Sequence, residues 1–172
     1  MLVWINGPFG GGKTTTADAL ATDTGWPRFD PEHVGFVLQA NLRDIEIDDF
    51  QDLSAWRALV PAMADELMAF RGSDTMIAVQ SVLDESYWSE IRAGLTGRGR
   101  DVFHVWLTCD EDELRRRIEH DEDEADARAW RLDHVDAFTR ARWACGAADL
   151  IVDTTGRSPE AIAATIAHAV RA

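Results

Sequence analysis

The chain is poor in positive charge. Its 172 residues include 31 Asp and Glu but only 17 Lys and Arg, which gives a net charge of −14 and a pI near 4.6. A surface of this sign repels phosphate backbones, so we expect neither nucleic acid nor an anionic membrane as the main partner. We interpret the acidity itself as favouring solubility.

Cysteines and long apolar runs are also scarce. The two cysteines, Cys109 and Cys145, fit no metal-ligand spacing and cannot build a disulfide framework, so we expect buried, reduced thiols. No apolar run approaches the length of a membrane span. An apolar strand is expected directly at the start of the chain, which leaves no place for a signal peptide ahead of it. These features predict a cytoplasmic protein.

Lysine is the rarest charged residue, since the 17 basic residues are 16 arginines and one lysine, Lys13. This lysine lies in G-P-F-G-G-G-K-T, residues 7–14, which satisfies the phosphate-binding pattern G-x-x-x-x-G-K-[ST]. The glycines let the backbone approach a polyphosphate without a Cβ in the way, and successive N–H groups form an anion-binding nest. In this pattern the ammonium of Lys13 reaches the β- and γ-phosphates, and the hydroxyl of Thr14 holds Mg²⁺.

Two observations argue against a chance match. The motif follows a strand-like apolar run and precedes a helix-like run, and a lysine stands where every other basic position is arginine. The chain has no second lysine for a guanine-reading N-K-x-D motif, so ATP is the expected nucleotide. The predicted nucleotide site comprises Gly7, Pro8, Phe9, Gly10, Gly11, Gly12, Lys13, Thr14 and Thr15.

Alternating strand-like and helix-like segments predict the fold class. Short strands are expected at residues 2–5, 28–30, 75–83, 101–109 and 150–153. Helices are expected at residues 13–21, 32–42, 53–70 (with a kink or restart at Pro61), 85–95, 110–119, 127–145 and from 158 onward. This order favours one α/β domain over residues 1–172, with a five-stranded parallel sheet and helices on both faces. Ligands of such sheets bind at the carboxyl ends of the strands, where Asp30 and Gln80 are expected, whereas His104 is expected in mid-strand facing a helix.

Several stretches together resemble the tunicamycin-resistance (TmrB-like) ATP-binding proteins. They are W-I-N-G-P-F-G-G-G-K-T-T-T-A at 4–17, F-D-P-E-H-V-G at 29–35, D-L-S-A-W at 52–56 and L-T-G-R-G-R-D-V-F-H-V-W-L-T-C-D-E-D-E-L-R-R-R-I at 95–118. These proteins group with the small P-loop kinases related to nucleoside monophosphate, shikimate and gluconate kinases and to chloramphenicol phosphotransferase. The resemblance implies a three-layer, nucleoside monophosphate kinase-like P-loop fold, ATP with Mg²⁺, a substrate flap near residues 31–70 and a mobile lid near residues 119–133.

The resemblance also implies roles for individual residues. Asp30 would contact the acceptor hydroxyl or Mg²⁺ and accept the hydroxyl proton; the alternative is a cap of the helix that follows it. Glu32 would join that site, or serve only as a first-turn acid. Arg117 matches the arginine that stacks on adenine in related kinases, with a solvated helix charge as the alternative.

Further candidates lie in the implied lid and flap. Arg128 and Arg131 would clamp the γ-phosphate; the alternatives are an i,i+4 salt bridge of Arg128 with Glu124 and a solvated charge for Arg131. Trp56 and Arg57 would offer an aromatic face and a cation to the acceptor, although a core position is at least as expected for Trp56.

One position departs from the family pattern. Related P-loop enzymes often end the third strand with an Asp that holds Mg²⁺ through water, whereas this chain has Gln80, which suits an acceptor or a water better than a metal. Either Asp30 takes the metal role, or the catalytic assignment is weaker than the fold assignment. The sequence therefore predicts an ATP-dependent small-molecule kinase, with a nucleoside-type antibiotic such as tunicamycin as one candidate acceptor. The alternative is an ATP-binding protein that sequesters a ligand or switches shape with nucleotide, and the oligomeric state stays open between monomer and homodimer.

Overall fold

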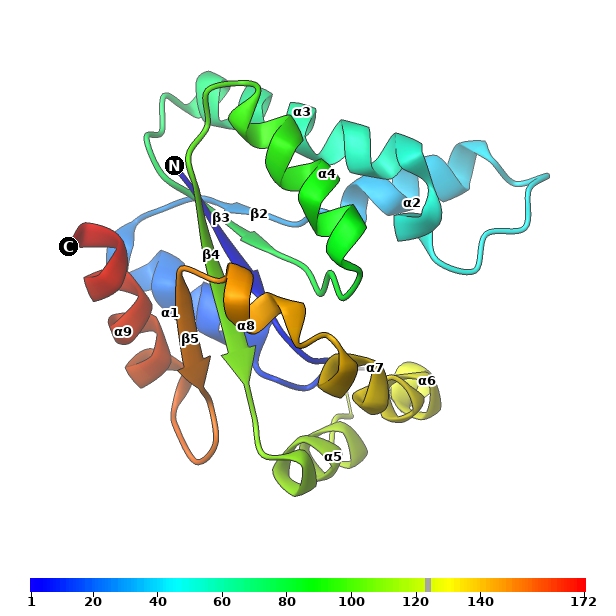
Figure 1. The fold of residues 1–172 in the computed structure, drawn as a ribbon, viewed down its shortest axis with the longest axis vertical. Helices are drawn as coiled ribbons and strands as arrows, with labels where there is room; N and C mark the ends of the chain where they lie inside the picture. Colours follow the sequence, from blue (N-terminus) through cyan, green and yellow to red (C-terminus); the bar gives the residue numbers. More distant parts are fainter. Residues whose placement is uncertain (123–124) are drawn as a thin grey trace.

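A computed structural model describes residues 1–122 and 125–172 and contains one parallel sheet (Figure 1). Its five strands are β1 (Leu2–Asn6), β2 (Arg28–Phe29), β3 (Met76–Val79), β4 (Val102–Thr108) and β5 (Leu150–Asp153), and they lie in the order β2-β3-β1-β4-β5. Every neighbouring pair runs parallel. The predicted α/β class with a five-stranded parallel sheet is confirmed.

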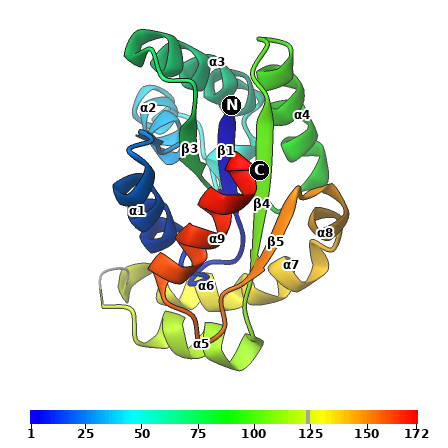
Figure 2. The same cartoon turned by 90° about the vertical axis from the view of Figure 1, so that its left-hand side faces the viewer.

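Helices cover both faces of the sheet (Figure 2). On one face lie α1 (Lys13–Thr24) and α9 (Pro159–Arg171). The other face carries α2 (Glu32–Asn41), α3 (Ser54–Arg71), α4 (Glu85–Thr96) and α8 (Trp143–Ala147). The helices α5 (Glu111–Glu119), α6 (Arg128–Asp133) and α7 (Val135–Arg140) lie beyond the carboxyl end of β4 (Figure 1). None of the helices in residues 1–122 and 125–172 is long and apolar enough to cross a membrane.

The apolar run of β1 explains why two layers of helices are needed. All four residues from Leu2 to Ile5 are fully buried. Leu2 and Trp4 pack toward α3 and α4, whereas the alternate residues Val3 and Ile5 pack toward α1 and α9. Burying each of these side chains stabilises the fold by roughly 2 kcal/mol, so the central strand is stable only with both faces covered.

His104 lies in the middle of β4 and faces α4, as predicted. Its ring centroid is 4.2 Å from that of Trp88, and its side chain is fully buried. The Nδ1 atom lies 3.3 Å from the carbonyl oxygen of Ala147, and Nε2 lies 3.4 Å from Nδ2 of Asn6. Burial lowers the pKa of His104 to about 4, so the imidazole is neutral at pH 7.

The predicted long helix over residues 127–145 is wrong, because three short helices occupy that span. Val135 of α7 packs with Leu114 and Ile118 of α5, whereas Ala144 of α8 packs against Trp106 of β4. One straight helix cannot reach two separate apolar clusters, and the chain turns at residue 134 and again at residues 141–142.

Two smaller expectations need correction, and one of the two alternatives at Pro61 is removed. The third strand ends at Val79 rather than continuing to residue 83. Helix α3 runs through Pro61 as one element, without a fresh start. Both cysteines are free thiols, but Cys109 is only half-buried and Cys145 is exposed, so their expected burial is wrong.

Candidate functional site

The glycine-rich loop joins β1 to α1 in a shape that side chains would prevent. Gly12 has a φ of 82°, in the left-handed region that favours glycine. A Cβ on Gly7 would lie 2.9 Å from Cβ of Leu107, which is closer than real carbon contacts allow. The loop therefore runs against β4 with its backbone rather than with side chains, as a phosphate cradle requires.

Polar side chains tie this loop to the segment after β3. The N–H of Gly7 donates to Oδ1 of Asn6 at 2.9 Å, and Oγ of Ser81 donates to the carbonyl oxygen of Gly7 at 2.8 Å. The Asn6 amide also bonds to both the N–H and the carbonyl oxygen of Val82, each at 2.9 Å. The strand ladder ends with the N–H of Gln80, which donates to the carbonyl oxygen of Ile5 at 3.3 Å, and these side-chain bonds hold the segment that follows against the loop.

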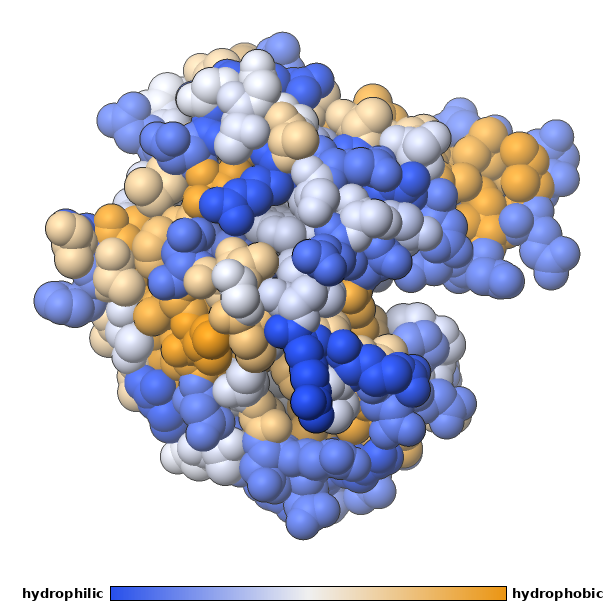
Figure 3. All heavy atoms as spheres, viewed as in Figure 1, coloured by the Kyte–Doolittle hydropathy of each residue, from blue (hydrophilic) through white to orange (hydrophobic). Residues whose placement is uncertain are grey.

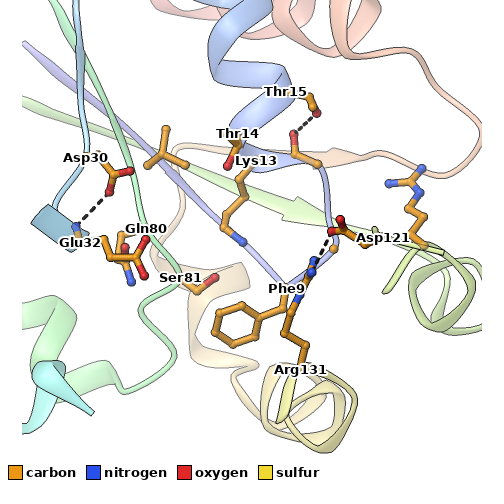
Figure 4. Close-up of a pocket in the computed structure, with 14 residues that line it drawn as sticks. Phe9, Lys13, Thr14, Thr15, Asp30, Glu32, Gln80, Ser81, Asp121 and Arg131 are labelled. Atoms are coloured by element: carbon orange, nitrogen blue, oxygen red, sulfur yellow. Dashed lines mark hydrogen bonds and ion pairs between the residues drawn. The ribbon is translucent and has the colours of Figure 1, made fainter. Parts of the chain in front are cut away.

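Lys13 lies at the centre of that cleft (Figure 4). Its Nζ donates to the carbonyl oxygen of Pro8 at 2.7 Å and lies 5.4 Å from the centroid of the Phe9 ring. Its ammonium therefore lies beside the glycine-rich loop, where the phosphate-binding pattern requires it.

The cleft itself has a volume of about 430 Å³ and opens into the notch between the α2–α3 end and the α6–α7 region (Figure 3). The predicted site residues in its lining are Phe9, Gly10, Gly12, Lys13, Thr14, Thr15, Asp30, Glu32, Gln80, Arg117 and Arg131. Three lining residues were not predicted: Val79, Ser81 and Asp121. Ser81 adjoins Gln80 at a predicted strand end, which is the one signal that pointed to it, whereas Asp121 is one acid within a long acidic run.

Asp30 combines the two interpretations that the sequence left open. Its Oδ1 accepts the N–H of Glu32 at 2.9 Å, so the side chain caps the start of α2. The same carboxylate lines the cleft opposite Lys13 (Figure 4). Capping fixes the orientation of the carboxylate and does not remove it from the cleft.

Arg131 is buried in the cleft wall, with 5% of its surface exposed. Its Nη1 donates to Oδ2 of Asp121 at 2.8 Å, so the alternative of a solvated charge is wrong. Arg128 lies outside the cleft lining, and its Nη2 donates to the carbonyl oxygen of Asp121 at 3.1 Å. The structure thus brings only one of the two predicted clamp arginines to the cleft, and the proposed partner Glu124 lies outside the described residues.

Arg117 lies beside the glycine-rich loop and is bonded to the segment after β5. Its Nη2 donates to the carbonyl oxygen of Thr154 at 2.9 Å and pairs with Glu113, so it is not a solvated helix charge. A second cavity of about 200 Å³ adjoins the cleft here. Its lining comprises Gly10, Gly11, Gly12, Thr15, Thr16, Arg117, Arg157, Pro159 and Ile162.

The two flap residues expected to bind the acceptor are not part of the cleft. Trp56 is fully buried in the core, and its Nε1 donates to the carbonyl oxygen of Pro31 at 3.0 Å. Arg57 donates to Oε2 of Glu90 at 2.7 Å and lies 4.2 Å from the Tyr87 ring centroid. Trp56 is therefore a core residue, as the alternative held, whereas acceptor binding by Arg57, which lies outside the cleft lining, stays a prediction.

Metal ligands in the cleft are few and are all oxygens. In the part of the chain that the structure describes, no group of three or more His, Cys, Asp or Glu side chains is placed to hold a metal ion. Thr14 and Asp30 both line the cleft and are of the oxygen class that Mg²⁺ prefers, usually together with phosphates and waters. The donor set fits a metal held jointly with a polyphosphate rather than a cage made by the protein alone.

Comparisons with known proteins agree with this geometry. The sequence matches the family described as AAA domain over residues 2–142. The tunicamycin resistance protein of Deinococcus radiodurans is 27% identical, with a TM-score of 0.71 over 98% of this chain and 94% of that one. No curated protein matches the chain at a significant level.

Two more distant structures share the fold. The APS kinase of Mycobacterium tuberculosis, in complex with AMPPNP and APS, is 19% identical, with a TM-score of 0.66 over 99% of this chain and 97% of that one. The shikimate kinase of Acinetobacter baumannii, in complex with shikimate, is 16% identical, with a TM-score of 0.68 over 99% of this chain and 92% of that one.

Proposed function

Because the chain belongs to this AAA domain family of P-loop proteins, we propose that it is an ATP-dependent phosphotransferase. It moves the γ-phosphoryl group of ATP to a hydroxyl of a small acceptor. The observation that carries the proposal is that Lys13 and Asp30 line one cleft, with the phosphate cradle at one end and a carboxylate at the other. Phosphoryl transfer needs these two elements on either side of the reacting phosphorus.

The nucleotide occupies the glycine-rich end. The backbone of residues 7–12 and the hydroxyls of Thr14 and Thr15 cradle the phosphates, and Lys13 stabilises the charge that develops on them. Adenine lies in the adjoining cavity of about 200 Å³, where Arg117 forms one wall. The loop that follows β5 supplies backbone contacts there, since Arg117 already holds it through Thr154.

The acceptor occupies the opposite end, beside Asp30, Glu32 and Gln80. Its hydroxyl oxygen forms a bond to the γ-phosphorus as the bond to the β–γ bridging oxygen breaks and ADP leaves. Asp30 accepts the hydroxyl proton, and its capped geometry holds the carboxylate in place for this task. Gln80 and Glu32 orient the acceptor by hydrogen bonds.

Thr14 would hold Mg²⁺ together with the phosphates, and Asp30 would be its carboxylate ligand only in place of the proton-accepting role, because the residue after β3 is Gln80 and offers no carboxylate. When bound, the ion neutralises part of the phosphate charge. Arg131, oriented by Asp121, faces the same phosphates and stabilises the charge on the equatorial oxygens. We propose residues 119–133 as a lid and residues 31–70 as a substrate flap within a single domain of residues 1–172.

A nucleoside-type antibiotic such as tunicamycin is the first acceptor to test, given the 27% identity to the Deinococcus radiodurans tunicamycin resistance protein. A second function, ligand sequestration or nucleotide-driven switching without transfer, is favoured by Gln80 at the position where an acid is common. The test is ADP release from Mg·ATP across tunicamycin, nucleosides, sugars and hydroxyl-bearing antibiotics, with Lys13→Ala as the blank. A Lys13-dependent signal with one acceptor supports the kinase; tight ATP binding with no signal favours sequestration.

A further inference from the structure

Most charged residues of the cleft are separated by position, and Asp121 at the basic end is paired with Arg131. The three basic residues of the cleft, Lys13, Arg117 and Arg131, come from α1, α5 and α6 and surround the glycine-rich loop. The end formed by β2, β3 and the start of α2 instead carries two carboxylates, Asp30 and Glu32, together with neutral polar and apolar groups (Figure 4). The end that faces an acceptor is therefore acidic.

The arginines of the surrounding elements have partners elsewhere. The side chain of Arg57 in α3 is only 10% exposed; it bonds to Glu90 and stacks on the ring of Tyr87. Arg28 of β2 pairs with Asp18. Nε of Arg43, just after α2, donates to the carbonyl oxygen of Ala40 at 3.1 Å. Residues 123–124 are both acids in the sequence, so every Lys and Arg of the chain is among the described residues, and none of them lines the acceptor end.

The first N–H groups of α2 already have acceptors within the chain and are not available to an anion. The N–H of Glu32 donates to Oδ1 of Asp30 at 2.9 Å, and the N–H of His33 donates to the Asp30 carbonyl oxygen at 3.3 Å. The N–H of Val34 donates to the carbonyl oxygen of Pro31 at 3.1 Å, and proline itself has no N–H. The groups that make a helix start attractive to anions are already used within the chain.

We infer that the acceptor carries no anionic group and is a hydroxyl-rich compound that is either neutral or bears an amine. The inference rests on the proposed phosphotransferase function. A carboxylate, phosphate or sulfate on the acceptor would face Glu32 and Asp30 with no arginine or lysine beside it, although Arg or Lys normally binds such groups. A Mg²⁺ ion at Asp30 would already be shared with the phosphates of ATP. A hydroxyl or an ammonium instead finds acceptors in Asp30 and Glu32 and an amide in Gln80.

Related acceptors that differ in charge test this inference. Glucose, glucosamine and glucuronate form one set, in which each charged member carries one charge, and uridine with the doubly charged uridine monophosphate forms another. We measure binding to the protein saturated with AMPPNP by calorimetry, and transfer from Mg·ATP by ADP release. In each set from which the protein binds or phosphorylates a member, we expect the neutral or amine-bearing compound to have at least tenfold higher kcat/KM and affinity than the anionic compound.

Two variants assign the effect to the acidic end. Glu32→Gln keeps the side-chain shape and removes one charge, so discrimination against the anionic member should fall about tenfold. Glu66→Gln removes an exposed carboxylate of α3 that lies outside the cleft lining, so discrimination should not change. An unchanged ratio in Glu32→Gln would show that the acidic end does not select the acceptor.

The outcomes separate this inference from the proposed function. Lys13-dependent transfer to the anionic members alone overturns the inference and leaves the phosphotransferase standing. Binding of neutral or amine-bearing members without transfer contradicts the phosphotransferase and supports the charge preference. If no neutral or amine-bearing compound binds or reacts, the inference is wrong.

Discussion

The ring of Phe9, in the glycine-rich loop, lies edge-on against the indole of Trp130 in α6, with the centroids 4.9 Å apart and the planes at 69°. Trp130 in turn stacks on His134 at 3.8 Å. Arg131, the next residue after Trp130, reaches the cleft from the same helix. The aromatic contact therefore sets the position from which α6 presents its guanidinium to the phosphate cradle.

A double-mutant cycle tests this contact. Phe9→Leu and Trp130→Leu should each raise the dissociation constant of ATP about threefold to tenfold, because an edge-to-face pair contributes roughly 0.5–1.5 kcal/mol. The double variant should be little weaker than either single variant, since the two changes remove one interaction. Fluorescent-nucleotide titration measures all four proteins, and additive losses would show that the rings act independently.

Arg131 and Arg128 form a matched pair for testing the phosphate clamp. Arg131→Gln should lower kcat about a hundredfold or more, because it removes a positive charge aimed at the transferring phosphoryl group. Arg128→Gln removes the same charge from outside the cleft lining and should change kcat less than threefold. Steady-state kinetics compare the two variants, and equal effects would contradict the assignment of the clamp to Arg131.

Asp30→Asn separates capping from proton transfer. Asparagine keeps the side-chain oxygen that accepts the N–H of Glu32, so stability should stay within about 0.5 kcal/mol of the wild type. ATP binding should persist, while transfer should fall about a hundredfold or more because the amide cannot accept the hydroxyl proton. Urea unfolding and ADP release are measured together, and undiminished transfer would reduce Asp30 to a capping residue.

His104 predicts how stability depends on pH. Burial lowers its folded-state pKa to about 4, while the unfolded chain titrates near 6.5. As the pH falls from 7 to 5 the unfolded state takes up a proton that the folded state does not, so His104 should cost about 2 kcal/mol of unfolding free energy. The loss begins near pH 6.5 and levels off below pH 4.

The comparison with His104→Gln isolates this effect from the many carboxylates. The variant lacks the titrating ring. Its unfolding free energy should also fall between pH 7 and pH 5, but by about 2 kcal/mol less than the unfolding free energy of the wild type does. Urea titrations at the two pH values give both differences. Identical differences in the two proteins would mean that folding does not lower the pKa of His104.

The sequence predicted the parts of the molecule that local patterns determine. The glycine-rich loop follows from residue types at fixed spacing, and the parallel sheet follows from largely apolar strands such as Leu2–Asn6 that alternate with helices. The meeting of Asp30, Gln80 and Lys13 in one cleft was also predictable, because the carboxyl ends of parallel strands share one edge of the sheet.

Features that depend on which surfaces meet in three dimensions were not predictable. An aromatic residue at the start of a helix fits a ligand surface or a core equally well, and only packing beside Phe50 shows that Trp56 belongs to the core. The break between α6, α7 and α8 arises because two apolar clusters lie in different directions, which helical periodicity cannot reveal. Likewise, Arg131 and Arg128 look equivalent in the sequence, and only the fold of the chain places one of them in the cleft.

The most direct test of the account is the fate of the γ-phosphoryl group. The protein is incubated with ATP labelled in the γ-phosphoryl oxygens, Mg²⁺ and each candidate acceptor, and mass spectrometry follows the label, with Lys13→Ala treated identically. We expect the label to move to a hydroxyl of a neutral or amine-bearing acceptor, and Lys13→Ala to lose this transfer by orders of magnitude. Label that stays in ATP while nucleotide and acceptor are both bound, or transfer that survives in Lys13→Ala, would contradict this expectation.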